Sequence, residues 1–522
     1  MKPVELFVSP EIAVNREMLL PEIAKKSGIA VSEIVDFYIV KRSVDARRKP
    51  VKIRLLIDIV TDPNQIPSSP FQLIYNQVHH SPPVIIVGAG PAGLFAAIKL
   101  IELNYKPIII ERGKTVRERG RDVAAINTLG IVNPESNYCF GEGGAGTFSD
   151  GKLYTRSTRR GNINRILDLF IAFGALPEIK IDAHPHIGTN KLSKIIATIR
   201  KYIVDAGGEI LLTTKVVDLL ITSPKIKGVK TSDGTSIKAE AVILATGHSA
   251  RDIFTLLHNK KLQLEAKPFA LGVRIEHPQA LIDSIQYHCE TRSTFLPPAR
   301  YNLVTQVEGR GVYSFCMCPG GNIAPCATNP DEVVTNGWSP AKRDSPYANA
   351  GLVVEVKRED LKEYAQFGPL AAMYFQKHIE HQAFLAGGGN QVAPAQRLRD
   401  FMGSKLSSSL PKCSYKPGLN SVNLKEVLPA LIADRLKAGL NYFGKRMPAY
   451  LTNEAVLVAV ESRTSSPVRI PRNPDTLQHL QIPGLFPCGE GAGYAGGIVS
   501  SALDGENCAE AAGRYLEGIE VR

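Results

Sequence analysis

Residues 83–111 have the sequence PVIIVGAGPAGLFAAIKLIELNYKPIIIE, in which a short apolar strand leads into Gly88-x-Gly90-x-x-Gly93. An amphipathic helix and a second apolar strand follow the glycines. The first glycine permits a tight strand-to-helix turn, the second lets a pyrophosphate approach the backbone, and the third lets helix and strand pack closely. This order of elements predicts a βαβ unit that binds a dinucleotide.

The second strand of this unit ends at an acid, Glu111. A carboxylate at this position can accept hydrogen bonds from both hydroxyls of a ribose. The start of the helix presents free N–H groups and the positive end of its dipole to a pyrophosphate. The alternative is a purely structural βαβ turn, which we favour less because strand, helix, second strand and acid all agree. The predicted contacts here are Gly88, Gly90, Pro91, Ala92, Gly93, Glu111 and Arg112.

Composition places the chain among globular proteins. Its 522 residues are enough for about three domains and a large core. Hydrophobic residues make up 44% and charged residues 21%, which is ordinary for a soluble protein. The longest apolar run contains the glycines and proline of the dinucleotide motif, so we expect no membrane insertion. The N-terminus has no signal-peptide pattern, and we expect a cytoplasmic location.

Cysteines and net charge limit the alternatives further. The eight cysteines form no repeated CxxC pair and no CxxC-plus-histidine spacing, which favours reduced thiols over a disulfide framework and predicts no metal site. The net charge of +12 suits an anionic partner, but also a diphosphate cofactor and an acidic substrate. Charge therefore does not decide between these partners.

We expect the chain to be organised in four segments. Short helices at 21–27 and 31–35 and strands at 37–41 and 51–60 predict a small N-terminal α+β domain, and the proline-rich stretch 62–70 is typical of a loop. Alternating strands and helices follow, and the composition changes near residue 267. The predicted segments are the N-terminal domain at 1–80, the first part of the dinucleotide-binding domain at 81–266, an inserted substrate or cap domain at 267–445, and the C-terminal part of the dinucleotide-binding domain at 446–522.

The densest basic cluster has the sequence KRSVDARRK at residues 41–49, between the two strands expected in the N-terminal domain. The simplest interpretation is a solvated helix or loop face. A docking surface for the rest of the chain, or for a protein or acidic partner, is the second interpretation. We do not expect nucleic-acid binding, because recognition of single strands needs aromatic stacking platforms beside the charge.

A second glycine-rich stretch, GLFPCGEGAGYAGG, occupies residues 484–497 near the C-terminus. A short strand ends near Glu490, which can hydrogen-bond the hydroxyls of a flexible polyol, and a helix begins near Gly497. The start of that helix can stabilise a developing negative charge. The alternative is a glycine-rich turn before an amphipathic helix. Together with the strand that ends in ATG at 245–247, these stretches add to the predicted site Thr246, Gly247, Gly489, Glu490, Gly496, Gly497 and Ile498.

Together these motifs resemble the FAD-binding scaffold of the glutathione-reductase-like flavoprotein superfamily, although that superfamily more often has aspartate where this chain has Glu490. The chain is similar over its whole length to uncharacterised bacterial FAD-dependent dehydrogenases with a small N-terminal domain. The segments that carry this similarity are KRSVDARRKP, FGEGGAGTFSDGKL, ATGHSARD, FCMCPGG, ESRTSSPVRI and GEGAGYAGGI. The resemblance implies an α/β fold with a Rossmann-like FAD-binding domain, an inserted α+β substrate domain and a small N-terminal α+β domain. It also implies FAD as the cofactor.

Three residues are candidates for catalysis beside a flavin. Arg463 can stabilise an anionic reduced flavin or clamp a substrate carboxylate, and the alternative is a structural ion pair with Glu461. Lys152 lies in a glycine-rich loop that can pass along the flavin and can face an anion, or the loop is purely structural. His248 follows the ATG strand.

Two cysteines, Cys316 and Cys318, form a CxC pair. We favour buried thiols on a strand over a redox pair, because flavin disulfide reductases usually carry CxxxxC instead.

These residues predict an FAD-dependent oxidoreductase that transfers hydride between flavin N5 and an unidentified small-molecule substrate. The flavin would supply the chemistry, and the substrate would bind between the flavin domain and the inserted domain. Only one convincing dinucleotide fingerprint occurs, so NADH or NADPH, if used, would bind transiently. The alternatives are a flavin-dependent tRNA-modifying enzyme and a non-catalytic flavin redox sensor or scaffold.

Overall fold

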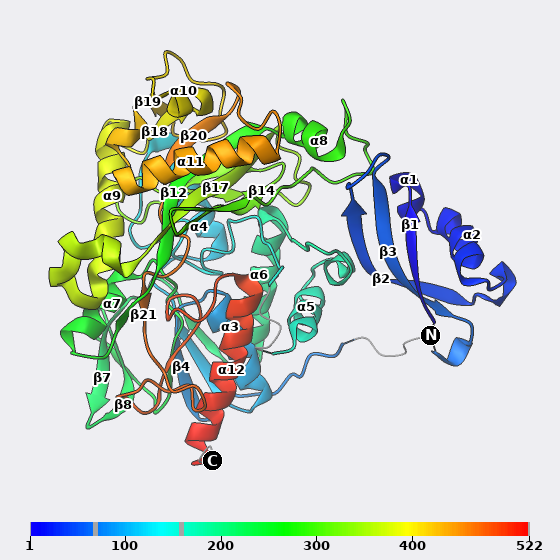
Figure 1. The fold of residues 1–522 in the computed structure, drawn as a ribbon. Helices are drawn as coiled ribbons and strands as arrows, with labels where there is room; N and C mark the ends of the chain where they lie inside the picture. The colour runs from blue at the N-terminus through cyan, green and yellow to red at the C-terminus, as the bar shows by residue number, and fades with distance from the viewer. Residues whose placement is uncertain (1, 66–70, 156–160, 520–522) are drawn as a thin grey trace.

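The computed structural model describes residues 2–65, 71–155 and 161–519, and it has the mixed α/β fold with a parallel sheet that the sequence predicts (Figure 1). Within these ranges four sheets have three or more strands: a three-stranded N-terminal sheet, a five-stranded parallel sheet, a seven-stranded large sheet and a second three-stranded sheet that packs on the parallel sheet. No helix in the same ranges has the length and apolar character needed to cross a membrane.

The parallel sheet contains the predicted βαβ unit. Its strands, in spatial order, are β22 (Leu485–Pro487), β10 (Val242–Leu244), β4 (Pro83–Val87), β5 (Lys106–Ile110) and β6 (Glu209–Leu211). All neighbouring strands run parallel. Both faces are covered, which explains why the central strands are nearly continuous runs of valine and isoleucine. The last strand of the chain therefore completes a sheet that begins at residue 83.

Two layers cover this parallel sheet. One face packs against helices α3 (Pro91–Glu102), α5 (Ile163–Ala172), α6 (Thr189–Asp205) and α12 (Ile498–Leu516). The other packs against strands β7 (Val216–Thr222), β8 (Lys225–Thr231) and β9 (Ser236–Lys238) and helix α7 (Arg251–Asn259). The C-terminal helix α12 lies along α3 (Figure 1), and a Cβ at Gly505 would be only 2.1 Å from the carbonyl oxygen of Ala92.

The large sheet forms the second half of the molecule (Figure 1). Its strands, in spatial order, are β13 (Val304–Val307), β14 (Arg310–Cys318), β17 (Tyr347–Val356), β12 (Phe269–Pro278), β20 (Val456–Glu461), β18 (Ala393–Arg397) and β19 (Leu419–Ser421). Helices α8 (Gln279–Tyr287), α9 (Ala371–Gly387), α10 (Leu398–Gly403) and α11 (Ala430–Arg446) accompany it. Strand β20 lies in this sheet, whereas we expected residues 446–522 beside the dinucleotide; the division into domains stays a prediction.

Two short two-stranded sheets accompany the larger ones. Strand β11 (Glu265–Ala266) pairs with β21 (Val468–Arg469), and β15 (Asn322–Pro325) pairs with β16 (Thr335–Trp338), both of which lie between β14 and β17 in sequence. Helix α4 (Val116–Leu129) follows the βαβ unit. In sequence, β11 comes before the strands of the large sheet and β21 comes after them. Their pairing therefore lies where the chain enters and leaves this half of the molecule.

The N-terminal sheet has the order β1 (Lys2–Val8), β3 (Lys52–Val60), β2 (Asp36–Asp45), with helices α1 (Pro10–Ala13) and α2 (Arg16–Ser27) packed on it. Both predicted strands are confirmed, and the predicted helix at 21–27 begins earlier, at Arg16. The prediction for residues 41–49 was wrong in part, because its first half continues strand β2 instead of forming a helix or loop. Residues 66–70 of the predicted loop lie outside the described residues.

One member of the basic cluster contacts the rest of the chain. The Arg42 N–H donates to the carbonyl of Ile181 at 2.7 Å, the Ala183 N–H donates to the Arg42 carbonyl at 2.9 Å, and the Arg42 guanidinium pairs with Asp182 at 2.7 Å. Within the chain, Arg42 is therefore an internal docking point for the N-terminal sheet.

Candidate functional site

A cavity of about 1190 Å³ lies between the carboxyl ends of the parallel strands and the large sheet. This volume exceeds the range typical of pockets for drug-sized ligands. Of the predicted site residues, the cavity brings together Gly88, Gly90, Pro91, Ala92, Glu111, Arg112, Lys152, Thr246, Gly247, His248, Arg463, Glu490, Gly496, Gly497 and Ile498. Gly93 and Gly489 do not line the cavity, but their sequence neighbours Ala92 and Glu490 do.

The three glycines of the turn after β4 have different surroundings. Gly88 has a φ of +106°, and a Cβ there would lie 2.5 Å from the Ala245 carbonyl oxygen. A Cβ at Gly93 would lie 2.0 Å from the Gly88 carbonyl oxygen. A Cβ at Gly90 would meet only Gly144, at 3.8 Å. Gly88 and Gly93 are thus required by the fold, whereas Gly90 leaves open surface that a ligand can approach.

Glu111 ties three backbone segments together around the cavity. Its carboxylate accepts N–H groups from Ala89 at 2.9 Å, Gly113 at 2.9 Å and Gly141 at 3.0 Å. A carboxylate has about four acceptor positions, so these bonds leave little capacity for a ribose. Glu111 thus has a structural role that the sequence did not indicate, and its ribose contact stays a prediction. Arg112 beside it pairs with Glu135 at 2.6 Å and Asp252 at 3.1 Å.

Two helices begin at the cavity with open N-termini. The N-cap residues are Gly90 for α3 and Gly497 for α12. Among the described residues, neither helix has a side chain at its N-cap that accepts hydrogen bonds from the first-turn N–H groups. First-turn N–H groups without such a partner are available to an anionic or polar ligand. The starts of α3 and α12 both line this cavity, so one ligand with two separated polar groups could contact both helices.

Glu490 and His248 lie side by side on this wall. The His248 Nε2 atom is 3.9 Å from Glu490 Oε1, and its Nδ1 atom is 3.1 Å from the Ser249 hydroxyl. Burial raises the pKa of Glu490 to about 7, although the Lys267 charge opposes the shift. Burial, together with the charges of Arg463 and Arg251, lowers the pKa of His248 to about 4. His248 is therefore an uncharged imidazole at pH 7, with one N–H donor and one acceptor nitrogen.

Arg463 is held by protein groups on every side. Its Nε donates to Glu380, its Nη1 to Ser249 and Thr328, and its Nη2 to Glu332 and Glu380, at 2.8–3.3 Å. A guanidinium has five N–H donors, and these contacts use all of them. The alternative interpretation named Glu461 as the partner, which is wrong because Glu461 pairs with Arg274 at 3.3 Å and Arg463 pairs with Glu332 and Glu380. Arg463 therefore has no free donor with which to clamp a substrate carboxylate, and its role in stabilising a reduced flavin stays a prediction.

The carboxylates around Arg463 form a buried network with Arg251. Arg251 donates to Glu332 at 2.9 Å and to Glu380 at 2.9 Å, and both carboxylates are fully buried. Burial by itself would raise the pKa of Glu380, but the charges of Arg251 and Arg463 outweigh it and lower this pKa to about 2. The network is thus two cations balanced by two anions.

The sequence did not indicate the cations beside Glu490. Lys267 and Arg469 both line the cavity, and the Nε atom of Arg469 is buried without a hydrogen-bond partner among the described residues. Burial, with the Arg469 charge, lowers the pKa of Lys267. Arg469 lies in the ESRTSSPVRI segment, which gave some signal, whereas Lys267 reaches the site only through the pairing of β11 with β21.

Lys152 faces two sulfur atoms. Its Nζ atom is 3.4 Å from Cys316 Sγ and 3.7 Å from Cys318 Sγ. Cys316 lines the cavity, whereas Cys318 is fully buried, and both lie on strand β14 as the sequence predicts. Lys152 therefore contacts two thiol groups of the chain, and its role toward an anionic ligand stays a prediction.

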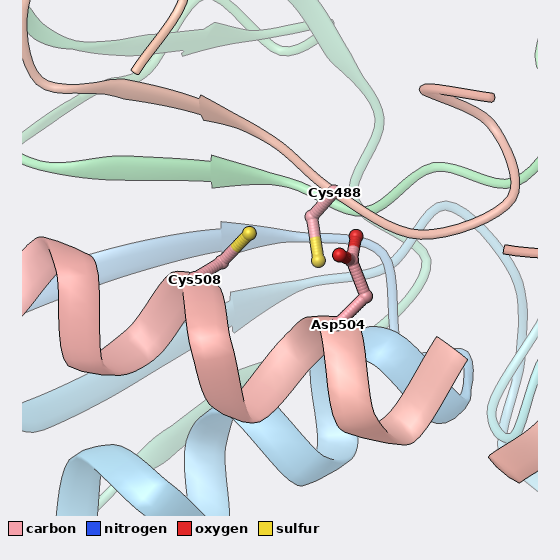
Figure 2. A group of neighbouring side chains, drawn as sticks. All are labelled: Cys488, Asp504 and Cys508. Carbon is pink, nitrogen blue, oxygen red and sulfur yellow. The ribbon is translucent and has the colours of Figure 1, made fainter. Parts of the chain in front are cut away.

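Figure 2 shows Cys488 after strand β22 facing Asp504 and Cys508 on α12, an arrangement that resembles a metal ligand set. Arg472 already neutralises this group, because its guanidinium lies 2.6 Å from Asp504 Oδ1 and 3.3 Å from Cys508 Sγ. Asp504 also accepts the Gly489 N–H at 2.7 Å. We therefore infer that the cluster of Cys488, Asp504 and Cys508 stabilises the backbone turn at Gly489.

Comparison with known proteins identifies the class of the chain. Residues 268–464 match the family described as FAD-dependent protein, C-terminal domain-like, and residues 1–60 match a domain of unknown function. The chain is 40% identical to an uncharacterized protein of Clostridium beijerinckii over 512 residues, which cover 94% of this chain and 95% of that one.

Two further similarities are partial. A thiamine thiazole synthase of Methanococcus vannielii is 26% identical over 194 residues, covering 35% of this chain and 62% of that one. The crystal structure of a flavoprotein/dehydrogenase from Cytophaga hutchinsonii is 12% identical, with a TM-score of 0.37, and the match covers 85% of this chain and 80% of that one.

This chain belongs to the same family as the uncharacterized Clostridium beijerinckii protein, and its residues 268–464 match the FAD-dependent protein, C-terminal domain-like family. FAD is accordingly its cofactor.

Proposed function

We propose that the protein is an FAD-dependent oxidoreductase of the glutathione-reductase-like type that acts on a small molecule and binds FAD in the large cavity. The observation that carries this proposal is the meeting of two uncapped helix starts, at Gly90 and Gly497, on one cavity wall. FAD is a long ligand with a central pyrophosphate, and it supplies hydride chemistry when bound.

The residues at the cavity wall fit this cofactor. The open surface at Gly90 and the start of α3 suit the pyrophosphate, and Glu111 holds the backbone that surrounds the adjoining ribose position. Glu490 suits the ribityl hydroxyls, and the start of α12 suits the electron-accepting part of the flavin. These assignments follow from the donor and acceptor types that each wall presents.

The substrate is proposed to enter from the side of the large sheet. Strand β14 contributes Tyr313, Ser314 and Phe315 to the cavity opposite the helix starts. Lys267 adds positive charge near Glu490, and Arg469 adds positive charge near Lys267 on the same cavity wall, so a substrate with an anionic group would be held there. His248, neutral at pH 7, can donate or accept a hydrogen bond but adds no charge.

Two glycine variants test the FAD site. Gly90 has an extended backbone and no close neighbour, so Gly90→Val should fold while its side chain enters the cavity. We expect Gly90→Val to lose most of its FAD, measured as flavin absorbance per protein, while the cofactor-free protein unfolds at the wild-type temperature. Gly93→Ala should instead destabilise the fold itself, because its Cβ would overlap the Gly88 carbonyl. Full FAD occupancy in a folded Gly90→Val variant would contradict the site.

The electron donor has its own test. The purified FAD-loaded protein would be titrated anaerobically with NADH and with NADPH, and the flavin absorbance followed. We expect one of the two to bleach the flavin, which would identify a nicotinamide-linked enzyme. A flavin that neither nucleotide bleaches would contradict a nicotinamide donor and favour reduction by the substrate itself.

A further inference from the structure

We propose that Cys316 and Cys318 form a redox-active dithiol on the cavity wall, which passes two electrons from reduced FAD to a disulfide substrate. This inference rests on the proposed function, since it names the substrate class of the same site. The observations that carry it are the position of the two thiols, the cations around them and the burial of the second thiol.

The backbone of strand β14 aims Cys316 at the cavity. Its pairing with β17 shifts between Phe315 and Cys318, where β14 carries one more residue than its partner. Bulges of this kind re-aim a side chain and are frequent beside active sites. Cys316 consequently lines the cavity, and Cys318 lies fully buried behind it, with its thiol donating to the Cys316 carbonyl at 3.3 Å.

Two cations enclose the pair. Lys152 Nζ contacts both sulfur atoms, and the Arg274 guanidinium lies 3.5 Å from Cys318 Sγ and 2.8 Å from the Cys316 carbonyl oxygen. Structural buried cysteines have apolar surroundings, whereas reactive ones lie beside lysine or arginine. Among the described residues, the two sulfur atoms accept the hydrogen bonds of the Lys152 ammonium, and a thiolate is a stronger acceptor than a thiol.

The two thiols have different pKa values. The neighbouring Cys318 side chain, and then the charges of Lys152 and Arg274, lower the pKa of Cys316 well below that of an ordinary thiol. The neighbouring Cys316 side chain, together with burial, raises the pKa of Cys318.

Acids around the cavity act in the opposite direction. Asp150 raises the pKa of the Cys316 thiol. Glu461 and Glu490 also interact unfavourably with a Cys316 thiolate. Because Cys316 lines the cavity and its Sγ atom contacts Lys152 Nζ, whereas Cys318 is buried behind it, Cys316 is the nucleophile and Cys318 the resolving thiol.

The reaction balances as follows. The Cys316 thiolate attacks one sulfur of the substrate disulfide, the S–S bond breaks, and the leaving thiolate takes the proton of Cys318. The Cys318 thiolate then attacks Cys316 Sγ and expels the second substrate thiolate, which water protonates. The resulting Cys316–Cys318 disulfide accepts two electrons and one proton from reduced FAD and so returns to a thiolate and a thiol. A reduced pyridine nucleotide is the original donor of these electrons.

Alkylation tests the thiolate without relying on turnover. The FAD-loaded protein would be treated with iodoacetamide from pH 5 to 9, and each cysteine quantified by mass spectrometry. We expect Cys316 to react at pH 7 at least about tenfold faster than an ordinary thiol of similar exposure. Cys139 is the internal control, because it is half-buried on the same cavity wall. Equal rates for Cys316 and Cys139 would overturn the proposal.

Variants of the lysine separate charge from folding. Lys152→Met should raise the pH midpoint of Cys316 alkylation, and Lys152→Arg should restore it towards wild type, since arginine keeps the positive charge. Flavin absorbance confirms that each variant retains its cofactor. An unchanged midpoint in a folded Lys152→Met variant would overturn the assignment of Lys152.

Disulfide formation tests the second thiol. Excess glutathione disulfide should convert the wild-type pair to a Cys316–Cys318 disulfide, detected by mass spectrometry as a loss of two hydrogens. Cys318→Ser should stop at the mixed disulfide with glutathione, and Cys139→Ser should behave like wild type. A wild-type pair that stays reduced would overturn the proposal, even with FAD bound. These thiol readouts remain valid if NADH and NADPH fail to bleach the flavin, so the two proposals can fail separately.

Discussion

Arg463 illustrates at the residue scale how a buried charge is balanced. Removing it leaves Glu332 and Glu380 with Arg251 as their cation in this network. Breaking a buried ion pair by deleting one partner costs about 3–5 kcal/mol. We therefore expect Arg463→Met to lower the free energy of unfolding by about 3–5 kcal/mol, measured by urea denaturation.

A surface pair provides the control for this variant. Arg54 pairs with Glu5 where both side chains are about half exposed. Exposed pairs contribute about 0–1 kcal/mol, so Arg54→Met should leave stability nearly unchanged. If Arg463→Met were no more harmful than Arg54→Met, the buried network would not be the role of Arg463.

The sequence correctly predicted the roles of residues whose contacts lie within a few positions along the chain. Gly88 and Gly93 were assigned correctly to a tight turn and close packing, because both contacts arise within a few residues of the motif. The partners of Arg463 could not be predicted, since they come from other segments of the chain. Glu461, the nearest acid in sequence, faces a different arginine.

At the scale of elements, the packing of α12 on α3 controls the cavity wall. A Cβ at Gly505 would lie 2.1 Å from the Ala92 carbonyl oxygen, and backbone cannot yield as a flexible side chain does. We expect Gly505→Ala to move α12 away from α3, to cost about 1–3 kcal/mol of stability and to weaken FAD retention. Thermal unfolding and flavin absorbance would measure the two effects.

A glycine in another helix is the matched control. Gly120 lies within α4, and an added Cβ there would meet nothing within 4 Å. Gly120→Ala should therefore stabilise the protein slightly, by about 0.5–1 kcal/mol. Equal effects of the two substitutions would show that the α3–α12 contact is not close.

Element type was predictable except where charge concealed a strand. Residues 41–45 continue β2 although they include two adjacent basic residues. Strand β2 lies at the edge of the N-terminal sheet, and edge strands commonly carry charges that face solvent. Their composition therefore resembles that of a loop, which is why the prediction ended the strand too early.

At the scale of the whole molecule, the pair of Arg42 and Asp182 joins the N-terminal sheet to the rest of the chain. Both side chains are partly exposed, so their coupling should be about 0.2–1 kcal/mol. We expect Arg42→Glu to loosen the docking and Asp182→Arg to restore it in the double variant. Small-angle X-ray scattering would detect the loosened state as a larger radius of gyration, and equal radii in all variants would contradict the docking role.

The overall arrangement was only partly predictable. The sequence indicated that the C-terminal stretch returns to the dinucleotide-binding region, and β22 does pair with β10 in the parallel sheet. It did not indicate that β20 joins β12 and β18, because nothing local distinguishes a buried strand of one sheet from that of another. The meeting of Lys152 with the two thiols depends on the same long-range packing.

The position of β22 also bears on how the protein is made. Ribosomes deliver a chain from its N-terminus, so α3 emerges with β4 and β5 long before α12 exists to cover it. The apolar face of α3 then has to be shielded during synthesis, a situation in which unfinished chains associate with chaperones. We expect FAD to be captured only after translation ends, so a message truncated before residue 485 should yield a colourless product.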